Sequence, residues 1–157
     1  NSYILDIGAY PGGWSQVCSE IVDSGKILSL DLKKIDKIKN VSILECNFLE
    51  EKSKKKVLAF FEKKIDLIIS DMAANTTGNK ALDCIRTNQL CTDVINYSSE
   101  ILKPEGVLVS KVFMGEDFIE TKNFAKSKFK KVQFFKPESS RNESKETYLH
   151  CSILKTL

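Results

Sequence analysis

The most informative part of the sequence is Ile4-Leu5-Asp6-Ile7-Gly8-Ala9-Tyr10-Pro11-Gly12-Gly13-Trp14. Its apolar start is typical of a buried strand, and a helix is predicted to begin after the last glycine. In an open α/β sheet, the turn between such a strand and helix lies at the carboxyl edge, where ligands bind. Gly8, Gly12 and Gly13 would let a ligand approach the backbone closely, since no Cβ stands in the way. The plainer alternative is that these glycines only make a tight turn.

The rest of the chain alternates short apolar runs with helical stretches. Strands are predicted at 3–7, 27–31, 41–45, 65–70, 107–113, 132–135 and 147–154, and helices at 14–22, 53–64, 88–102 and 117–129. Strands separated by helices indicate βαβ units, which cross over right-handed into a parallel sheet. The last run alternates apolar and polar residues, which suits an antiparallel strand nearer an edge. We therefore predict a Rossmann-like α/β fold: a seven-stranded, mostly parallel sheet with the last strand antiparallel and helices on both faces.

Length and composition indicate one globular domain over residues 1–157. The chain is 42% hydrophobic and 29% charged, as in ordinary globular proteins. No apolar run approaches the ~20 residues that cross a bilayer, so no membrane partner is expected. The chain enters its first strand directly after Asn1-Ser2. We expect that a native N-terminal segment is missing.

The cysteines predict neither a disulfide framework nor a metal site. Their number, five, is odd, no pair has the spacing Cys-x-x-Cys, and His150 is the single histidine. Reduced, mostly buried thiols in a cytoplasmic protein fit this pattern better. We expect no metal, a cytoplasmic location and a monomer.

The residues around the first turn favour an adenosine ligand without a pyrophosphate. Ala9 and Tyr10 occupy the place of the second glycine of Gly-x-Gly-x-x-Gly, which disfavours an NAD-dependent oxidoreductase. Asp31 ends the second predicted strand, where an acid can accept hydrogen bonds from both ribose hydroxyls. Asn47 follows the third strand and could read an adenine edge with its amide. The cofactor that fits these features most simply is S-adenosylmethionine.

A lysine inside an apolar strand marks the candidate chemistry. Lys111 lies within the run 107–113, although lysine is rarely buried without a partner. Asp71 follows the fourth strand and Glu146 opens the last one, so both could lie beside it at one edge of the sheet. These three are the predicted catalytic residues. A structural ion-pair network is the alternative, since such networks also perturb pKa values.

Four sequence blocks resemble, in order, the motifs of the FtsJ-type RNA ribose 2′-O-methyltransferases. The first block is residues 6–16 and the second is Ser70-Asp71-Met72-Ala73, followed by Thr77-Gly78, Asp83 and Arg86. The third block is Lys111-Val112-Phe113-Met114-Gly115. The fourth is Lys136-Pro137-Glu138-Ser139-Ser140-Arg141, followed by Ser144 and Glu146-Thr147-Tyr148. Together they cover nearly the whole chain. The form Ser-Asp-Met-Ala is most similar to the bacterial branch that methylates a uridine of large-subunit (23S) ribosomal RNA.

The resemblance implies roles for individual residues. The family uses a Lys-Asp-Lys-Glu tetrad, and its last three members fall on Asp71, Lys111 and Glu146. Its first lysine would precede the first strand, outside this chain. Its cofactor residues fall on Gly12, Trp14, Asp31 and Asp71, while Asn47 replaces a further aspartate of the pattern.

The charge distribution favours a polyanionic partner. Residues 120–157 carry nine basic and four acidic residues, a net +5, so the remainder of this +3 chain carries −2. A basic end on a near-neutral body is typical of nucleic-acid binding, although a solvated lysine-rich surface would look similar. We expect Lys136 and Arg141 to hold RNA phosphates, with ribosomal RNA or the large ribosomal subunit as partner. A tRNA or mRNA-cap methyltransferase, or an RNA-binding relative without catalysis, are the alternatives.

Overall fold

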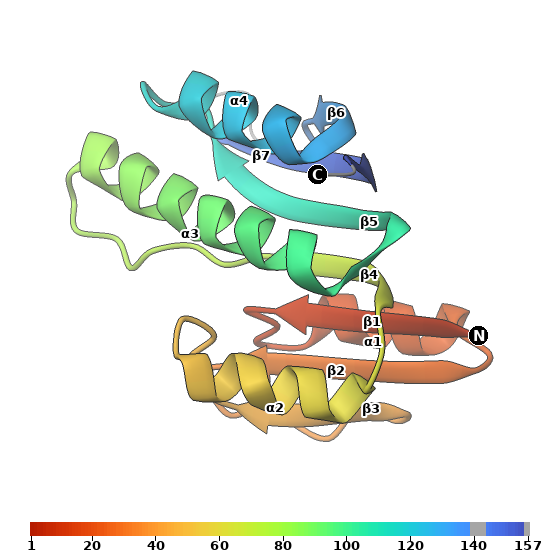
Figure 1. Cartoon of the computed structure of the whole chain (residues 1–157). Helices are drawn as coiled ribbons and strands as arrows, with labels where there is room; N and C mark the ends of the chain where they lie inside the picture. Colours follow the sequence, from red (N-terminus) through yellow and green to blue (C-terminus); the bar gives the residue numbers. More distant parts are fainter. Residues whose placement is uncertain (139–143, 156–157) are drawn as a thin grey trace.

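A seven-stranded sheet with strand order β3-β2-β1-β4-β5-β7-β6 forms the centre of the molecule (Figure 1). The computed structural model describes residues 1–138 and 144–155. The strands are β1 (Ser2–Ile7), β2 (Gly25–Asp31), β3 (Val41–Glu45), β4 (Ile65–Ser70), β5 (Leu102–Phe113), β6 (Phe129–Phe135) and β7 (Glu146–Leu154). The helices are α1 (Gly13–Ile21), α2 (Glu51–Phe61), α3 (Lys80–Ile101) and α4 (Phe118–Lys128).

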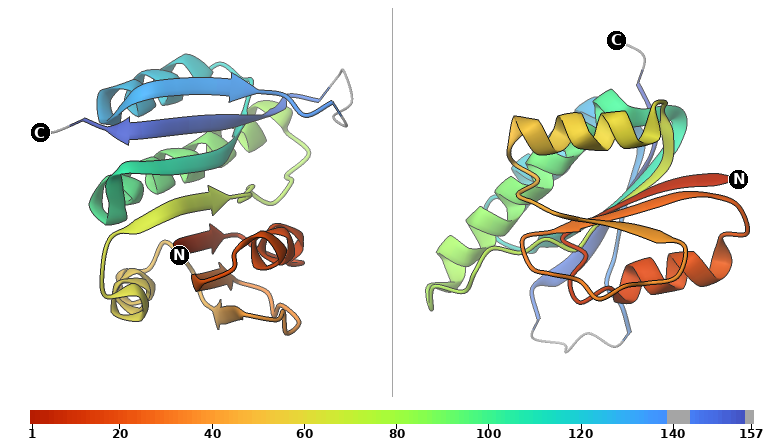
Figure 2. Two further views of the ribbon diagram at one scale, coloured as in Figure 1. Left: turned by 90° about the vertical axis from the view of Figure 1, so that its right-hand side faces the viewer. Right: turned by 90° about the horizontal axis from the view of Figure 1, so that it is seen from below.

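The strand pairing confirms the predicted topology. β1 pairs parallel with both β2 and β4, β2 with β3, and β4 with β5. β7 runs antiparallel to β5 on one side and to β6 on the other. β7 is therefore one strand removed from the edge, and β6 forms the edge itself. Helices cover both faces, with α2, α3 and α4 on one and α1 on the other (Figure 2).

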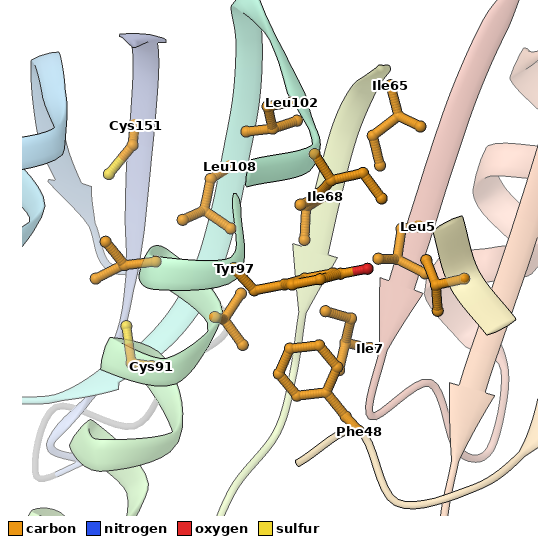
Figure 3. Close-up of a cluster of buried hydrophobic side chains, with 14 of the residues drawn as sticks. Leu5, Ile7, Phe48, Ile65, Ile68, Cys91, Tyr97, Leu102, Leu108 and Cys151 are labelled. Atoms are coloured by element: carbon orange, nitrogen blue, oxygen red, sulfur yellow. The ribbon is translucent and has the colours of Figure 1, made fainter. Parts of the chain in front are cut away.

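The main core lies between the sheet and helices α2, α3 and α4. Leu5, Ile68 and Leu108, from neighbouring strands, are fully buried beneath Tyr97 of α3 (Figure 3). The ring of Phe48 lies edge-on to Tyr97, with centroids 5.3 Å apart. Removing each such side chain from water contributes about 1.5–3 kcal/mol, so this core holds the strand ends in fixed relative positions.

Two elements begin five or more residues earlier than their sequence pattern predicts. α3 begins at Lys80 rather than 88, because the side chain of Asn79 accepts hydrogen bonds from the backbone N–H groups of Ala81 and Leu82 at 3.1 and 3.2 Å. β5 begins at Leu102 and includes Pro104, at a point where its register against β4 is irregular. Neither difference moves a predicted site residue.

The five cysteines are free thiols, four of them buried and Cys46 partly buried. Within residues 1–138 and 144–155 no three His, Cys, Asp or Glu side chains are grouped so as to hold a metal ion. Across the same residues, none of the helices combines the length and apolar character that a membrane span requires.

Candidate active site

Lys111 lies between two carboxylates at the carboxyl edge of the sheet. Its Nζ is 2.9 Å from Glu146 Oε1 and 3.2 Å from Asp71 Oδ1, and its side chain is only 13% exposed. The structure thus brings together the three predicted catalytic residues. Lys111 lies in β5, Glu146 is the first residue of β7, and Asp71 directly follows β4.

Strand alternation explains why a lysine fits inside this apolar strand. Ser110 and Val112 point toward the α3 side of the sheet and are buried there. Lys111 therefore projects from the opposite face, where its register partner on β7 is Tyr148. Asp71 is held beside β1 because its backbone N–H donates to the carbonyl of Ile7 at 3.2 Å.

The electrostatics of Lys111 depend on two opposing effects. Burial lowers the pKa of its ammonium, but the hydrogen bond to Glu146 and the charges of Asp71 and Glu146 outweigh burial, so the pKa is raised above its usual value. With these protein groups alone, Lys111 carries a positive charge at neutral pH. The sequence left the direction of this shift open, because it depends on interatomic distances.

Tyr148 is part of the same cluster, although no role was predicted for it. Its hydroxyl donates to Asp71 Oδ1 at 2.8 Å and lies 3.4 Å from Glu146 Oε1. Burial and the Asp71 carboxylate raise the pKa of this phenol, so it stays protonated and remains a donor. The sequence signal was its position two residues after Glu146 on one strand, which places both on the same face.

A cavity of about 370 Å³ opens beside this cluster, at the carboxyl ends of β1, β2 and β4. Gly8, Asp31, Asn47 and Asp71 line it, together with apolar side chains such as Met72. Four residues from the predicted cofactor set therefore share one cavity. The mixture of an apolar wall with two carboxylates, the amides of Asn47 and Asn75 and the Lys33 side chain is typical of a small-molecule site.

Two polar side chains in this cavity are oriented by the backbone around them. Asp31 accepts hydrogen bonds from the backbone N–H groups of Tyr10 at 3.0 Å and Lys33 at 2.8 Å, one on each carboxylate oxygen. A carboxylate oxygen has two acceptor positions, so Asp31 can accept further bonds from a ligand. Asn47 Oδ1 accepts from the N–H of Leu49 at 3.0 Å, and this contact fixes the plane of its amide.

The glycines of the first turn have different roles. Gly8 has a φ of +71°, and a Cβ there would lie 2.6 Å from Met72 Cγ, so the fold itself requires glycine. Gly12 has a φ of +119° and borders a separate hollow of about 790 Å³ between α1 and residues 36–40. A Cβ at Gly13 would meet no atom within 4 Å.

Trp14 does not line the 370 Å³ cavity either. Its ring lies against Tyr148, with centroids 5.5 Å apart. The structure therefore separates Gly12 and Trp14 from the cavity shared by Gly8, Asp31, Asn47 and Asp71.

Asp6 is a buried carboxyl that sequence reasoning did not assign to the site. It is fully buried, and its Oδ2 accepts from the hydroxyl of Ser15, at the start of α1. Its Oδ1 has no hydrogen-bond partner within the described part of the chain. Burial raises its pKa to about 6; the Ser15 hydrogen bond opposes this shift, and the charges of Asp71 and Asp31 add to it. The negative charges of Asp31 and Asp71 at this edge of the sheet thus act on the buried carboxyl group of Asp6.

One of the two predicted RNA contacts, Lys136, directly follows β6. Lys136 Nζ donates to the backbone carbonyl of Ser144 at 2.7 Å, which connects the two ends of the segment between β6 and β7. Arg141 lies outside the described residues.

Comparison with known proteins identifies the family. The sequence model of the FtsJ-like methyltransferases matches residues 1–153. The chain belongs to the FtsJ-like methyltransferase family. The predicted family resemblance is therefore confirmed over nearly the whole chain.

Relatives in this family share high identity with the chain. A protein of Pelagibacter ubique named "Ribosomal RNA large subunit methyltransferase E" is 45% identical over 152 residues, which cover 97% of this chain and 75% of the relative. A Rickettsia akari protein of the same name is 43% identical over 155 residues, or 95% of this chain and 68% of the relative.

Solved structures confirm the predicted Rossmann-like methyltransferase fold. The crystal structure of a protein described as a ribosomal RNA methyltransferase from Plasmodium falciparum has a TM-score of 0.87 and 30% identity, covering 98% of this chain and 87% of that one. Human methyltransferase-like protein 13, in complex with SAH, has a TM-score of 0.73 at 13% identity, covering 97% and 72%.

Proposed function

We propose that this protein is an S-adenosylmethionine-dependent RNA ribose 2′-O-methyltransferase that acts on a uridine of large-subunit 23S ribosomal RNA. The observation that carries the proposal is the position of Lys111, between Asp71 and Glu146 and beside a cavity of suitable chemistry. Membership of the FtsJ-like family and the names of the relatives from Pelagibacter and Rickettsia support the same activity and substrate.

The cavity residues suit S-adenosylmethionine. Asp31 would accept hydrogen bonds from the ribose hydroxyls, and Asn47 would face the adenine edge. The negative charges of Asp31 and Asp71 favour a ligand that carries a positive sulfonium and an ammonium group. SAH in structures of the same fold, including human methyltransferase-like protein 13, supports this cofactor class. Gly12 and Trp14 would act from outside the cavity, by shaping the turn and packing against Tyr148.

In this proposal the protein orients a ribose 2′-hydroxyl and accepts its proton. The bound cofactor supplies an activated methyl group whose leaving group is a neutral thioether, so this chain needs no general acid. Lys111 would hold the attacking oxygen in line, and Glu146 and Asp71 would fix the position of the lysine.

The proton of the hydroxyl has two candidate acceptors. Lys111 can accept it once its pKa falls, and a positive charge in the neighbouring cavity lowers that pKa. If Lys111 remains charged, Asp71 is the acceptor. General base catalysis of this kind contributes about 10²–10⁴ to the rate.

The basic C-terminal part of the chain would hold the RNA backbone. Lys136 lies at the same edge of the sheet as Glu146, and Arg141 belongs to the same family block. RNA affinity should therefore fall linearly with salt in a log–log plot, and a flat response would contradict a phosphate-binding surface. We infer that the protein is a cytoplasmic monomer.

A methyl-transfer assay tests the proposal. The protein is incubated with methyl-labelled cofactor and either large ribosomal subunits that lack the modification, naked 23S RNA, or total tRNA. We expect label in large-subunit RNA, in a dinucleotide that alkali does not cleave because its 2′-oxygen is blocked. Lys111→Met is the matched inactive control. Label found only in tRNA, or cofactor binding without transfer to any RNA, would overturn the proposal.

A further inference from the structure

The edge strand β6 presents an aromatic ring at the carboxyl edge of the sheet. Phe134 packs toward α4, where its ring centroid is 4.8 Å from that of Phe118. Phe135, the next residue and the last of β6, projects from the opposite face, the face that carries Lys111. The Phe135 side chain is 45% exposed.

Phe135 is held rigidly while much of its ring stays accessible. Its ring stacks on Tyr148 with centroids 5.5 Å apart and an interplanar angle of 21°. Its backbone carbonyl accepts a hydrogen bond from the Thr147 hydroxyl at 2.7 Å. Since Tyr148 covers one side of the ring, the exposed part lies on the ring edge and the other side. This arrangement leaves an aromatic surface open to a planar ligand.

This surface lies next to the proposed chemistry. Phe135 is the register partner of Tyr148 on β7, and Tyr148 is the register partner of Lys111 on β5. Neighbouring strands are about 4.8 Å apart, so the backbones at Phe135 and Lys111 are separated by about 10 Å. A base that belongs to the target nucleotide or to its neighbour in the RNA chain can span that separation.

Basic side chains lie close to this edge strand. Phe135 borders a hollow of about 620 Å³ that extends around β6 to Lys122 and Lys126 of α4, on the opposite face, where the Lys122 ammonium lies 5.9 Å from the ring centroid of Phe134. Lys136 follows Phe135 directly in the chain. An accessible aromatic ring among cations is the combination with which proteins bind single-stranded RNA, by stacking bases and neutralising phosphates.

We propose that Phe135 is a stacking platform for a nucleobase of the RNA substrate, either the base of the methylated nucleotide or an adjacent one. The inference rests on the proposed RNA methyltransferase function and adds a binding residue to it. Phe135 touches neither the reacting atoms nor the cofactor cavity, so a substitution of Phe135 should change the affinity for RNA.

Substitutions at Phe135 test the platform. Phe135→Ala should raise the KM for RNA by roughly five- to 150-fold, the range measured for loss of one stacked base, and leave cofactor affinity unchanged. Phe135→Tyr should retain wild-type KM, whereas Phe135→Leu, which keeps apolar area but has no π-face, should resemble the alanine variant. Leu58→Ala on α2 is the matched control, because Leu58 is 46% exposed and lies outside the site.

A second readout separates stacking from an indirect effect through Tyr148. RNA with 2-aminopurine at the target position or one nucleotide away should lose fluorescence on binding to wild type, and less on binding to Phe135→Leu. Equal quenching and equal KM in wild type and Phe135→Leu would overturn the inference. A fall in kcat with unchanged KM and quenching would overturn it too, since Phe135 would then only support Tyr148. If wild type quenches the probe but transfers no methyl group, the proposed function fails while the platform stands.

Discussion

The phenol of Tyr148 donates a hydrogen bond to Asp71 Oδ1 at 2.8 Å, the same oxygen that lies 3.2 Å from the ammonium of Lys111. One carboxylate oxygen therefore receives two donors, and the position of Lys111 depends on Tyr148 through Asp71. The aromatic ring of Tyr148 also contacts the rings of Phe135 and Trp14. Tyr148 is accordingly a positioning residue for the proposed reaction.

Tyr148→Phe should reduce kcat about tenfold, which corresponds to about 1.4 kcal/mol, because Asp71 loses one of its donors. Cofactor affinity should stay unchanged, because the ring remains. Tyr97→Phe is the control, since the Tyr97 hydroxyl donates to the backbone carbonyl of Lys54, 3.4 Å away, and not to the carboxylates beside Lys111. Steady-state kinetics of both variants check this, and an unchanged kcat for Tyr148→Phe would argue against positioning.

Lys111→Ala and Lys111→Met should each lower kcat by at least about 100-fold and leave cofactor affinity nearly unchanged. The methionine variant keeps most of the apolar length of the side chain, so it separates loss of the amine from loss of packing. Single-turnover kinetics and calorimetric titration with the cofactor measure the two effects. If either variant no longer binds cofactor, the assignment of Lys111 to the RNA side of the reaction is wrong.

The pKa of Lys111 should change with the ligand in the cavity. Burial lowers it, but Glu146 and Asp71 raise it further, so the amine is protonated across neutral pH in the protein alone. A positive sulfonium should lower this pKa relative to the neutral thioether product, and Glu146→Gln should lower it in both complexes. NMR titration of the Lys111 side chain with each ligand measures the shift. Identical titration curves with the cofactor and with its product would exclude Lys111 as a base whose pKa depends on the bound ligand.

Asp6 should make stability depend on pH. Its pKa is raised from 3.8 to about 6 by burial, so the folded protein binds a proton more tightly than the unfolded chain. The contribution of Asp6 to the free energy of unfolding is therefore greatest below pH 4. It falls by about 3 kcal/mol in total as the pH rises through 6. Asp6→Asn, which cannot ionise, should remove this part of the dependence. Urea unfolding at pH 5 and pH 8 tests it, and equal pH dependence in both proteins would refute it.

Gly8→Ala should destabilise the protein by more than about 1–2 kcal/mol and weaken cofactor binding. The new alanine would have to keep a φ of +71°. Its Cβ would lie 2.6 Å from Cγ of Met72, a residue that also lines the cavity. Gly13→Ala is the matched control: its Cβ would meet nothing within 4 Å, and alanine favours the helix that begins there. Thermal unfolding and cofactor titration of the pair check this, and equal effects at both positions would contradict it.

Much of the fold followed from local patterns. Apolar runs, helical spacing and the glycine turn predicted the strands, and the alternation in the last run predicted its antiparallel direction, because side-chain period and strand environment are linked. The start of α3 was missed because its signal is one side chain, Asn79, rather than a periodic pattern. The position of β7 inside the sheet depends on pairing with β6, which no local pattern encodes.

The candidate site was predictable only in part. Lys111 stood out as a lysine inside an apolar strand. The two carboxylates that pair with it belong to residues at strand ends, which were expected at the same edge of the sheet. Tyr148 and Asp6 lie within the sequence blocks but received no predicted role, because a tyrosine in a strand and an acid at a strand end are ordinary residues. Their roles arise from burial and from contacts with residues 77 and 9 positions away in the sequence.

The family, the order of strands and helices, and the residue types available for chemistry could be read from the amino-acid sequence, since these depend on periodicity and motif spacing. The charge of Lys111, and a cavity lined by Gly8 and Asp31 but not by Gly12 and Trp14, follow only from the folded structure. Desolvation and Coulomb interactions vary with burial and distance over a few ångströms. Those distances exist only once β4, β5 and β7 have paired.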